Sequence, residues 1–254
     1  MNVTLIGSGN VATTLGKLIK NAGHTFLQVI SRNELHAKTL AGMLNAEACT
    51  DVSKINSQAD IYIIAVSDNT INSIAEDLNL PGKIVVHTSG AASKEILKTV
   101  TENYGVFYPL QSIRKEKEET PVIPFLLDAS NEKTLQILKP FAATVSENVF
   151  EANDEQRLKL HIAAIFVSNF TNHLFALAEF YCEQENIPFK MLIPLIQETA
   201  LRLNEFSPKD VQTGPAIRND TTTIQKHLQE LNNYPELQKI YTTLTESILK
   251  MYVK

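Results

Sequence analysis

"NVTLIGSGNVATTL", residues 2–15, joins a short run of β-branched residues to a glycine loop and then to residues that favour a helix. Gly7, Gly9 and Ala12 in it have the spacing G-x-G-x-x-A. A loop of this kind binds the pyrophosphate of a dinucleotide, because Gly7 permits a tight turn, Gly9 admits the phosphates and Ala12 lets the helix pack closely on the strand. A plain glycine turn is the alternative. We therefore predict a strand over 2–7, then a helix, and a dinucleotide site between them.

The first 150 residues repeat this alternation of strand and helix patterns. Runs rich in β-branched residues stand at 25–31, 61–66, 83–88, 104–108 and 122–127. The alternation predicts the Rossmann-type α/β fold, a mainly parallel sheet wrapped by crossover helices. IYIIAV (61–66) and KIVVHT (83–88) are almost continuously apolar, so we expect these two strands in the middle of the sheet.

After Phe150 the strand pattern ends and helical periodicity replaces it, interrupted by Pro and Gly-Pro breaks. We predict about four helices, the first spanning roughly 153–185, and a domain boundary near residue 150. The expected domains are a Rossmann NADP-binding domain at 1–150 and an all-α substrate and dimerisation domain at 151–254. The apolar stretch from Leu160 to Phe180 is interrupted by polar residues such as His161 and Glu179, so we expect a buried helix of a soluble protein.

The composition excludes several functional classes. The chain has 254 residues, 44% hydrophobic and 20% charged, with a net charge of −5 and no dense basic patch, so neither nucleic acid nor an anionic membrane is an expected partner. Cys49 and Cys182 lie far apart, so we expect no disulfide framework and no metal site. No signal-peptide pattern begins the sequence, and a cytoplasmic location is expected. The mixed charges of KEKEE (115–119) indicate a solvated loop.

The end of the second predicted strand distinguishes NADP from NAD. There Ser31, Arg32 and Asn33 supply a hydroxyl, a guanidinium and an amide, whereas the first acid, Glu34, already belongs to the next helix. A carboxylate at this position would bond the ribose 2′-hydroxyl of NAD, while these donors suit a 2′-phosphate. The sequence therefore favours NADP, although Arg32 as an ordinary surface charge, and with it a preference for NAD, stays open.

Polar residues follow three of the strands, at the sheet edge where ligands bind in open α/β folds. They are Ser67-Asp68-Asn69, His87-Thr88-Ser89-Gly90 and the stretch from Tyr108 to Ser112. Each group also has a structural interpretation: Asp68 or Asn69 caps a helix starting at Thr70, His87 is a satisfied core residue, and Tyr108-Pro109 forms a turn. Together they define a plausible cleft beside the cofactor.

Two later segments supply further candidates. On the long helix, His161, Ser168, Asn172 and Glu179 fall on one stripe with Asn169 beside it, which predicts either hydrogen bonds to another helix or a wall of the cleft formed by 161–169. In QTGPAIRND (212–220), Arg218 and Asp220 offer an anion-binding guanidinium or a simple surface ion pair.

Six segments in chain order resemble a family of bacterial NADP oxidoreductases that join a Rossmann-like NADP-binding domain to a helical domain of unknown function. They are GSGNVA (7–12), VSD (66–68), HTSG (87–90), YPLQS (108–112), HIAAIFVSNF (161–170) and TGPAIRND (213–220). The resemblance covers almost the whole chain. It departs where Tyr108 replaces a more frequent His and Asn219 a more frequent Gly, which puts the proton-donating role of that histidine in doubt.

The chain also resembles pyrroline-5-carboxylate reductases and the 6-phosphogluconate and β-hydroxyacid dehydrogenases, which have the same domain order. This resemblance implies reductase chemistry, a helical domain like the C-terminal domain of 6-phosphogluconate dehydrogenase, and a homodimer paired through the helical domains. Those relatives often carry a catalytic Lys on the first long helix and an Asn one turn later. Here the helix offers Lys159, His161, Ser168 and Asn169 without that spacing, so the acid and the substrate stay open.

We predict an oxidoreductase that uses NADP(H), with NAD(H) less favoured, and passes a hydride between nicotinamide and a small carbonyl or imine substrate bound between the domains. A non-catalytic NADP(H) sensor or scaffold is the alternative. We expect His161 to be the proton donor, with Tyr108 and His87 next. Ser168 and Asn169 would orient the substrate and Arg218 hold a carboxylate. The expected cofactor residues are Gly7, Ser8, Gly9, Asn10, Val11, Ala12, Ser31, Arg32, Asn33, Val66, Ser67, Asp68, Thr88 and Ser89.

Overall fold

The computed structural model describes residues 1–114 and 121–252. The chain forms two compact units, Met1–Asn169 (the first unit) and Phe170–Lys254 (the second unit). The division falls later than residue 150, because the beginning of the long helix packs within the first unit. The KEKEE segment, predicted as a solvated loop, lies outside the described residues.

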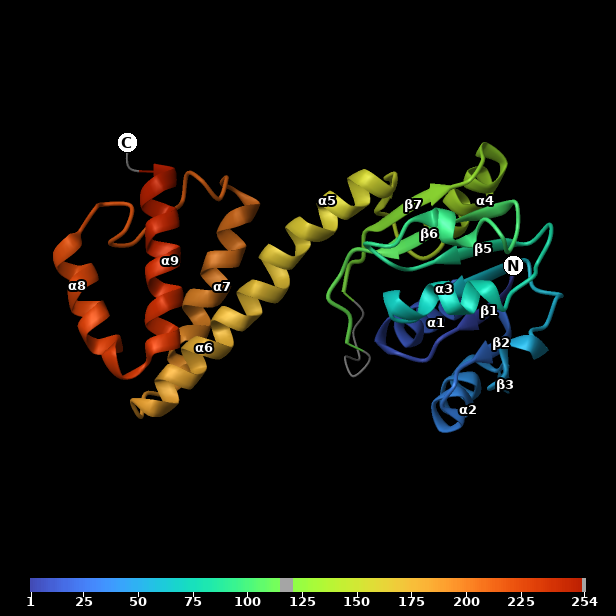
Figure 1. Cartoon of the computed structure of the whole chain (residues 1–254), viewed down its shortest axis with the longest axis horizontal. Coiled ribbons are helices and arrows are strands. Elements are labelled where there is room, and N and C mark those ends of the chain that lie inside the picture. Colours follow the sequence, from blue (N-terminus) through green and yellow to red (C-terminus); the bar gives the residue numbers. More distant parts are fainter. Residues whose placement is uncertain (115–120, 253–254) are drawn as a thin grey trace. The chain divides into compact units, whose positions relative to one another are not determined.

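A single sheet organises the described part of the first unit. Its strand order is β3-β2-β1-β4-β5-β6-β7-β8 (Figure 1). Neighbouring strands are parallel except β6 and β7, which are antiparallel. The predicted Rossmann-type, mainly parallel sheet is confirmed, and β4 and β5 lie in its middle as expected. The strands are β1 (Asn2–Ile6), β2 (Thr25–Ile30), β3 (Glu47–Cys49), β4 (Ile61–Ile64), β5 (Ile84–His87), β6 (Asn103–Pro109), β7 (Phe125–Ala129) and β8 (Val149–Glu151).

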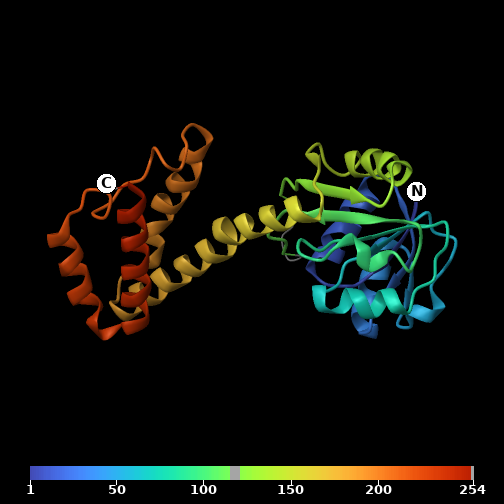
Figure 2. The same ribbon diagram turned by 45° about the horizontal axis from the view of Figure 1, so that its top comes forward.

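Helices cover both faces of this sheet. Side chains alternate along each strand, so Val3 and Leu5 pack into the layer of α1, α2 and α4, while Ile6 packs into the layer of α3 and η2. Figure 2 shows α3 on one side of the sheet and α4 on the other. The elements are α1 (Asn10–Asn21), α2 (Glu34–Leu44), η1 (Val52–Lys54), α3 (Asp68–Glu76), η2 (Lys94–Leu97) and α4 (Glu132–Ala143).

One helix runs from Asp154 to Gln184, close to the predicted span of 153–185. It consists of α5 (Asp154–Ala164), the π-helical stretch η3 (Ile165–Phe170) and α6 (Thr171–Gln184). With a mean hydropathy of 1.3 it is long and apolar enough to cross a membrane, a test that core helices of soluble proteins also pass.

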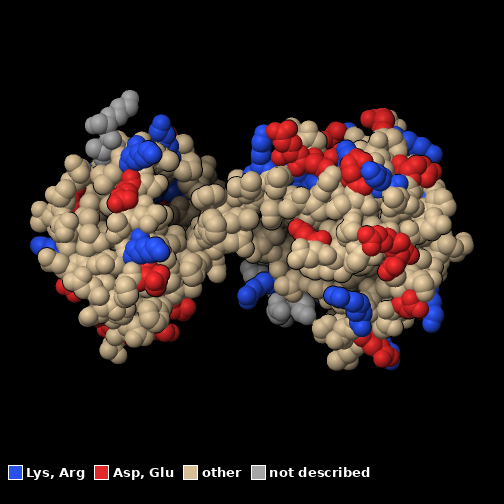
Figure 3. Space-filling view, viewed as in Figure 1, with Lys and Arg blue, Asp and Glu red and all other residues tan. Residues whose placement is uncertain are grey.

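The apolar side chains of this helix are exposed in the single chain. Val167 is 77% exposed and Ile162 49%, and no part of its apolar window is buried. The predicted burial of Leu160–Phe180 is therefore wrong for one chain, in which much of this apolar surface stays accessible. Figure 3 shows the stretch as a surface without charged side chains, in keeping with the absence of Asp, Glu, Lys and Arg between Lys159 and Glu179.

The described part of the second unit is helical, as predicted for the C-terminal region. Asn219 has a φ of 51°, a left-handed conformation that Gly adopts freely and that Asn tolerates better than most residues. The structure thus explains why Asn can stand where the resembling family has Gly. After α6 the elements are η4 (Phe189–Leu192), α7 (Ile193–Leu201), η5 (Arg202–Asn204), α8 (Thr221–Glu230), η6 (Leu231–Asn233) and α9 (Pro235–Tyr252).

Candidate cofactor and substrate site

Gly7 is required by the fold. Its φ is 123°, and a Cβ there would lie 2.1 Å from the carbonyl oxygen of Ala65. The Gly7 N–H donates a hydrogen bond to the carbonyl of Ile30 at 2.8 Å, which ties the loop to the end of β2. Only glycine combines this conformation with this close approach.

Gly9 has no such structural requirement. Its φ of −78° and ψ of −169° are open to any residue, and a Cβ there would meet no atom within 4 Å. Gly9 is the N-cap of α1, whose first turn carries neither an acidic residue nor a side-chain cap. The positive end of the helix dipole therefore faces space that glycine leaves open, an arrangement that suits a bound pyrophosphate.

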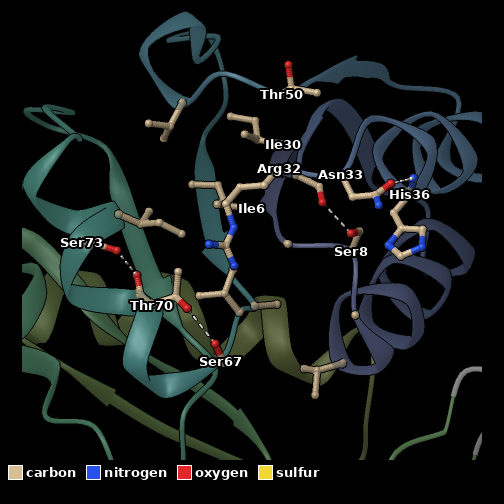
Figure 4. A pocket seen from close by; sticks show the side chains of 18 of the residues that line it. Ile6, Ser8, Ile30, Arg32, Asn33, His36, Thr50, Ser67, Thr70 and Ser73 are labelled. Atoms are coloured by element: carbon tan, nitrogen blue, oxygen red, sulfur yellow. Dashed lines mark hydrogen bonds between the residues drawn. The ribbon is translucent and has the colours of Figure 1, made fainter.

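A cavity of about 870 Å³ lies beside this loop and is called the cofactor cavity below (Figure 4). Most predicted cofactor residues line it, whereas Ala12 is buried where α1 packs on the sheet. Five polar or charged lining residues were not predicted: His36, Thr50, Thr70, Ser73 and Asp77. The predicted lining residues are Gly7, Ser8, Gly9, Asn10, Val11, Ser31, Arg32, Asn33, Val66 and Ser67.

Hydrogen-bond donors gather at the end of β2 in this cavity. The hydroxyls of Ser8 and Ser31 are 2.6 Å apart, and the Arg32 guanidinium points into the cavity (Figure 4). Asn33 caps α2 by accepting from the His36 N–H at 3.0 Å, which places the imidazole at the same rim. The spacing of an N-cap residue and its partner three residues later is the sequence pattern that could have identified His36.

The first acid after β2 in the sequence, Glu34, is engaged elsewhere. Glu34 does not line the cavity and forms an ion pair with Lys38 at 2.6 Å. A hydroxyl pair, a guanidinium and an amide therefore line the cavity at the end of β2, and these groups suit a phosphate dianion better than a neutral hydroxyl.

A second cavity, of about 630 Å³, adjoins the first and also belongs to the first unit. Val11 and Val66 line both. The second cavity brings together residues from five segments that are distant in sequence, and four of these segments form the clustering predicted for the sheet edge. The predicted catalytic residues that line it are Tyr108, His161, Ser168 and Asn169. Asp68, Thr88 and Ser89, expected at the cofactor, also line this second cavity.

Two local features place these residues. The N-cap of α3 is Ser67, so neither Asp68 nor Asn69 caps the helix, and Asp68 lines the second cavity from the first helical position. Ser168 and Asn169 both lie in the π-helical stretch η3, and short π segments are frequent at functional sites.

Tyr108 and His161 form a hydrogen-bonded pair in the second cavity. The Tyr108 hydroxyl lies 3.0 Å from His161 Nδ1, and the two rings meet edge to face. Burial raises the pKa of Tyr108, as does the Asp68 carboxylate, whereas the Arg157 guanidinium lowers it. Gly90 packs directly against both rings, since a Cβ there would lie 2.7 Å from His161 Nδ1 and 2.9 Å from Tyr108 Cζ.

His87 is a fully buried residue beneath this cavity and does not line it. Its Nδ1 accepts from the Ser89 N–H at 3.2 Å, and its Nε2 lies 3.3 Å from the carbonyl of Ser93, to which it donates in the matching tautomer. Burial, with the nearby charge of Arg157, lowers the pKa of His87 to about 4, so its ring is neutral near pH 7. The geometry thus favours the satisfied core histidine over the proton donor.

Two charged residues that the sequence did not suggest lie behind the pair. Arg157 is 0% exposed, and its Nη2 bonds Asp154 Oδ1 at 2.7 Å. The same nitrogen donates to the carbonyl of Ala92, and the Ser93 hydroxyl donates to the Asp154 carboxylate. Acidic and basic residues at the start of a helix normally indicate a solvated turn, so the sequence DEQRLKL (154–160) gave no sign of this cluster.

Arg218 belongs to the second unit. It is exposed in the turn before α8. Hydrogen bonds from the Thr223 N–H and hydroxyl lower the pKa of Asp220, the N-cap of that helix, and the charge of Arg218 adds to this effect. Among the described residues, no group of three or more His, Cys, Asp or Glu side chains is placed to hold a metal ion.

Comparisons with known proteins give two family matches. Residues 2–90 match the family described as "NADP oxidoreductase coenzyme F420-dependent", and residues 123–248 match "Domain of unknown function (DUF2520)". A search among curated proteins finds no match.

Solved structures resemble almost the whole chain. A "putative NADP oxidoreductase" from Bacteroides fragilis is 40% identical, with 98% of both chains covered and a TM-score of 0.89. A 1-pyrroline-5-carboxylate reductase from Streptococcus pyogenes is 12% identical, with 98% of both chains covered and a TM-score of 0.66. An imine reductase from Myxococcus stipitatus, solved with NADP+, is 17% identical, with 100% of both chains covered and a TM-score of 0.66. The pyrroline-5-carboxylate reductase and the imine reductase therefore share the fold of this chain.

Proposed function

This chain belongs to the family of NADP oxidoreductases in which the coenzyme-binding domain is followed by DUF2520, and we propose that it uses NADP(H) to interconvert a small carbonyl or imine compound with its reduced form. Gly9 carries the cofactor part of the proposal, because the fold itself has no need for glycine at that position. The NADP+ bound to the imine reductase, which shares the fold, supports the same cofactor and an imine as one substrate class.

The two adjoining cavities support the catalytic part of the proposal. Bound NADPH would lie in the cofactor cavity with its pyrophosphate at Gly9, and it would supply the hydride. Val11 and Val66 line both cavities and therefore mark where the nicotinamide and the substrate would meet. Tyr108 and His161 stand in the cavity on the substrate side.

The reaction needs one proton for each hydride. When the hydride joins the carbon of a C=O or C=N bond, the π electrons move to oxygen or nitrogen, and that atom takes up a proton. The Tyr108 hydroxyl can donate it, and His161 in its protonated form can restore it through Nδ1, 3.0 Å away. Asn169 and Ser168, from the same cavity wall, are placed to orient the substrate.

Arg32→Ala tests the cofactor assignment. We expect the Kd for NADPH to rise about tenfold and the Kd for NADH to stay unchanged, because only NADPH loses a charge-assisted contact to its 2′-phosphate. Nicotinamide fluorescence titration measures both constants. Lys17→Ala, which removes an exposed cation of α1 outside the cavity, is the matched control and should change neither. Equal losses for both cofactors in Arg32→Ala would contradict our account of the 2′-phosphate.

Turnover separates the enzyme from a sensor. Purified protein with NADPH should oxidise it when offered one or more members of a panel of cyclic imines, aldehydes and keto acids. NADPH that binds but remains unoxidised across the panel would support the non-catalytic alternative.

We further propose that the exposed apolar helices are covered by a second copy of this chain. Leu195 on α7 is 61% exposed, and Met191 and Leu201, close by in sequence, are 68% and 62% exposed. Apolar exposure on this scale marks an interaction surface. Leu195→Glu should raise the dimer dissociation constant about tenfold, measured by analytical ultracentrifugation, because it places a charge in the apolar contact.

Gln197→Glu adds the same charge at an exposed polar position of α7 and is the control, expected to leave the dimer intact. A monomeric wild type, or one that binds lipid vesicles, would overturn the homodimer proposal.

A further inference from the structure

Arg157 joins helix α5 to the turn that follows β5. Its guanidinium donates to the carbonyl of Ala92, and its partner Asp154 accepts from the Ser93 hydroxyl and, at 3.2 Å, from the backbone N–H of Lys94. Asp154 and Arg157 are three positions apart and therefore lie on one face of α5. Together they hold the C-terminal end of the turn 88–94. A second charged contact lies at the end of the turn, where Lys94 Nζ pairs with Asp128 Oδ1 at 2.7 Å and ties the turn to β7.

The clasped turn also determines the position of the catalytic pair. Gly90 belongs to it, and the space for a Cβ at Gly90 is already filled by His161 and Tyr108. His161 stands four residues after Arg157 on α5, so both side chains lie on the same helix face. A displacement of the turn relative to α5 would thus change the 3.0 Å contact between the Tyr108 hydroxyl and His161 Nδ1.

The guanidinium is a buried charge with unused donors. Arg157 is 0% exposed, and its Nε and Nη1 have no hydrogen-bond partner among the described residues. A buried cation whose donors are unsatisfied costs free energy, so its retention calls for an explanation beyond packing. The neighbouring groups on which it acts are Tyr108 and His87, both of which it disfavours in their protonated form.

The charges around the Tyr108 hydroxyl oppose one another. Asp68 from α3 and the burial of the ring both raise the pKa of Tyr108, which weakens it as an acid. Arg157 from α5 lowers that pKa. His161 contacts the hydroxyl directly, and neutral His87 lies beneath. Arg157 is therefore the fixed positive charge that counteracts Asp68.

We propose that Arg157 is the positioning residue of the Tyr108–His161 pair: it holds the turn 88–94 against α5 and supplies the buried positive charge that makes the Tyr108 hydroxyl an effective proton donor. The inference rests on the proposed function, in which this pair delivers the proton. Arg157 itself touches neither cavity, so it acts only through Tyr108 and His161.

The test places 3-fluorotyrosine at position 108 and follows its ionisation by fluorine NMR, a readout that needs no substrate. In Arg157→Met the titration midpoint should rise by about one pH unit, because a nearby buried positive charge favours the phenolate by that order. In Arg157→Lys, which keeps the charge but loses the planar fork, the midpoint should not move although thermal stability falls. Arg114→Met, which removes an exposed arginine, is the control and should not move it.

Two further measurements complete the test. The double variant Asp154→Asn/Arg157→Met removes both charges of the ion pair, so that no carboxylate is left without its partner, and it should show the same rise. With an imine that the wild-type protein reduces, the kcat of Arg157→Met should fall up to about tenfold at pH 7, because the Tyr108 hydroxyl becomes a weaker acid. An unchanged fluorine midpoint in both Met variants would overturn the inference. Failure of the wild type to bind NADPH would overturn the proposed function instead, and the fluorine titration would still decide the role of Arg157.

Discussion

Tyr108→Phe is expected to lower kcat about 100- to 10,000-fold, the usual contribution of a positioned general acid, with the Kd for NADPH unchanged. The phenol lines only the second cavity, so its loss leaves the cofactor contacts intact. Stopped-flow NADPH oxidation with a cyclic imine measures kcat, and fluorescence titration measures the Kd.

Tyr104→Phe is the matched control for this experiment. Tyr104 lies on the same strand, β6, and its hydroxyl donates to Glu95 at 2.9 Å outside both cavities. It should retain the wild-type kcat. If Tyr108→Phe were as active as Tyr104→Phe, the proton would have to come from His161 directly or from solvent, and the paired donor would be wrong.

Gly9→Ala is expected to raise the Kd for NADPH and for NADH alike, by about 10- to 100-fold, because the added methyl group occupies space that the pyrophosphate needs. Thermal stability should be unchanged or slightly higher, since the Cβ meets no atom within 4 Å and the backbone conformation suits alanine. Calorimetry and thermal unfolding measure the two effects separately.

Gly7→Ala gives the contrasting result. Its Cβ would overlap the Ala65 carbonyl, and its φ of 123° is unfavourable for alanine, so the variant should lose about 2 to 5 kcal/mol of stability whether or not cofactor is present. A Gly9→Ala protein that unfolded like Gly7→Ala, or that bound both cofactors with wild-type affinity, would remove the main support for the dinucleotide site.

The sheet could be predicted from sequence because its central strands are buried on both faces. β4 and β5 consist of continuous apolar residues, and the glycine loop locates β1 and α1. The three-residue strands β3 and β8 were missed, since EAC and VFE are too short to show a pattern and are only partly buried. The antiparallel direction of β7 was likewise hidden, because it depends on the connection after β6 and not on the composition of β7.

The surroundings of the long helix could not be predicted from the hydrophobicity of its residues. Its apolar side chains predict that the face is covered, and a single chain leaves that face exposed. The periodicity of 100° per residue also assumes an unbroken α-helix, whereas η3 widens the turn at 165–170. Ser168 and Asn169 both line the cavity from this stretch.

The site residues could be predicted where a local sequence motif directly follows a predicted strand. Ser8, Arg32 and the glycines follow strand ends and line the cofactor cavity. The environment of His87 and the cluster around Arg157 depend on contacts between residues more than sixty positions apart, such as Arg157 with Ala92. A single sequence carries no trace of such contacts. The same residues at the start of a helix would fit a buried ion pair or a solvated first turn equally well.

The residues that line the cofactor cavity all lie between Ile6 and Asp77, whereas the second cavity needs residues as far as Asn169. On the ribosome, where the N-terminus emerges first, every group that surrounds the dinucleotide is therefore synthesised before the helix that bears His161. With NADP(H) as the ligand, the nascent chain acquires its nucleotide-binding groups ahead of its catalytic ones. Because a bound ligand stabilises the folded state by mass action, the cellular nucleotide pool then influences the yield of mature protein as well as its rate of turnover.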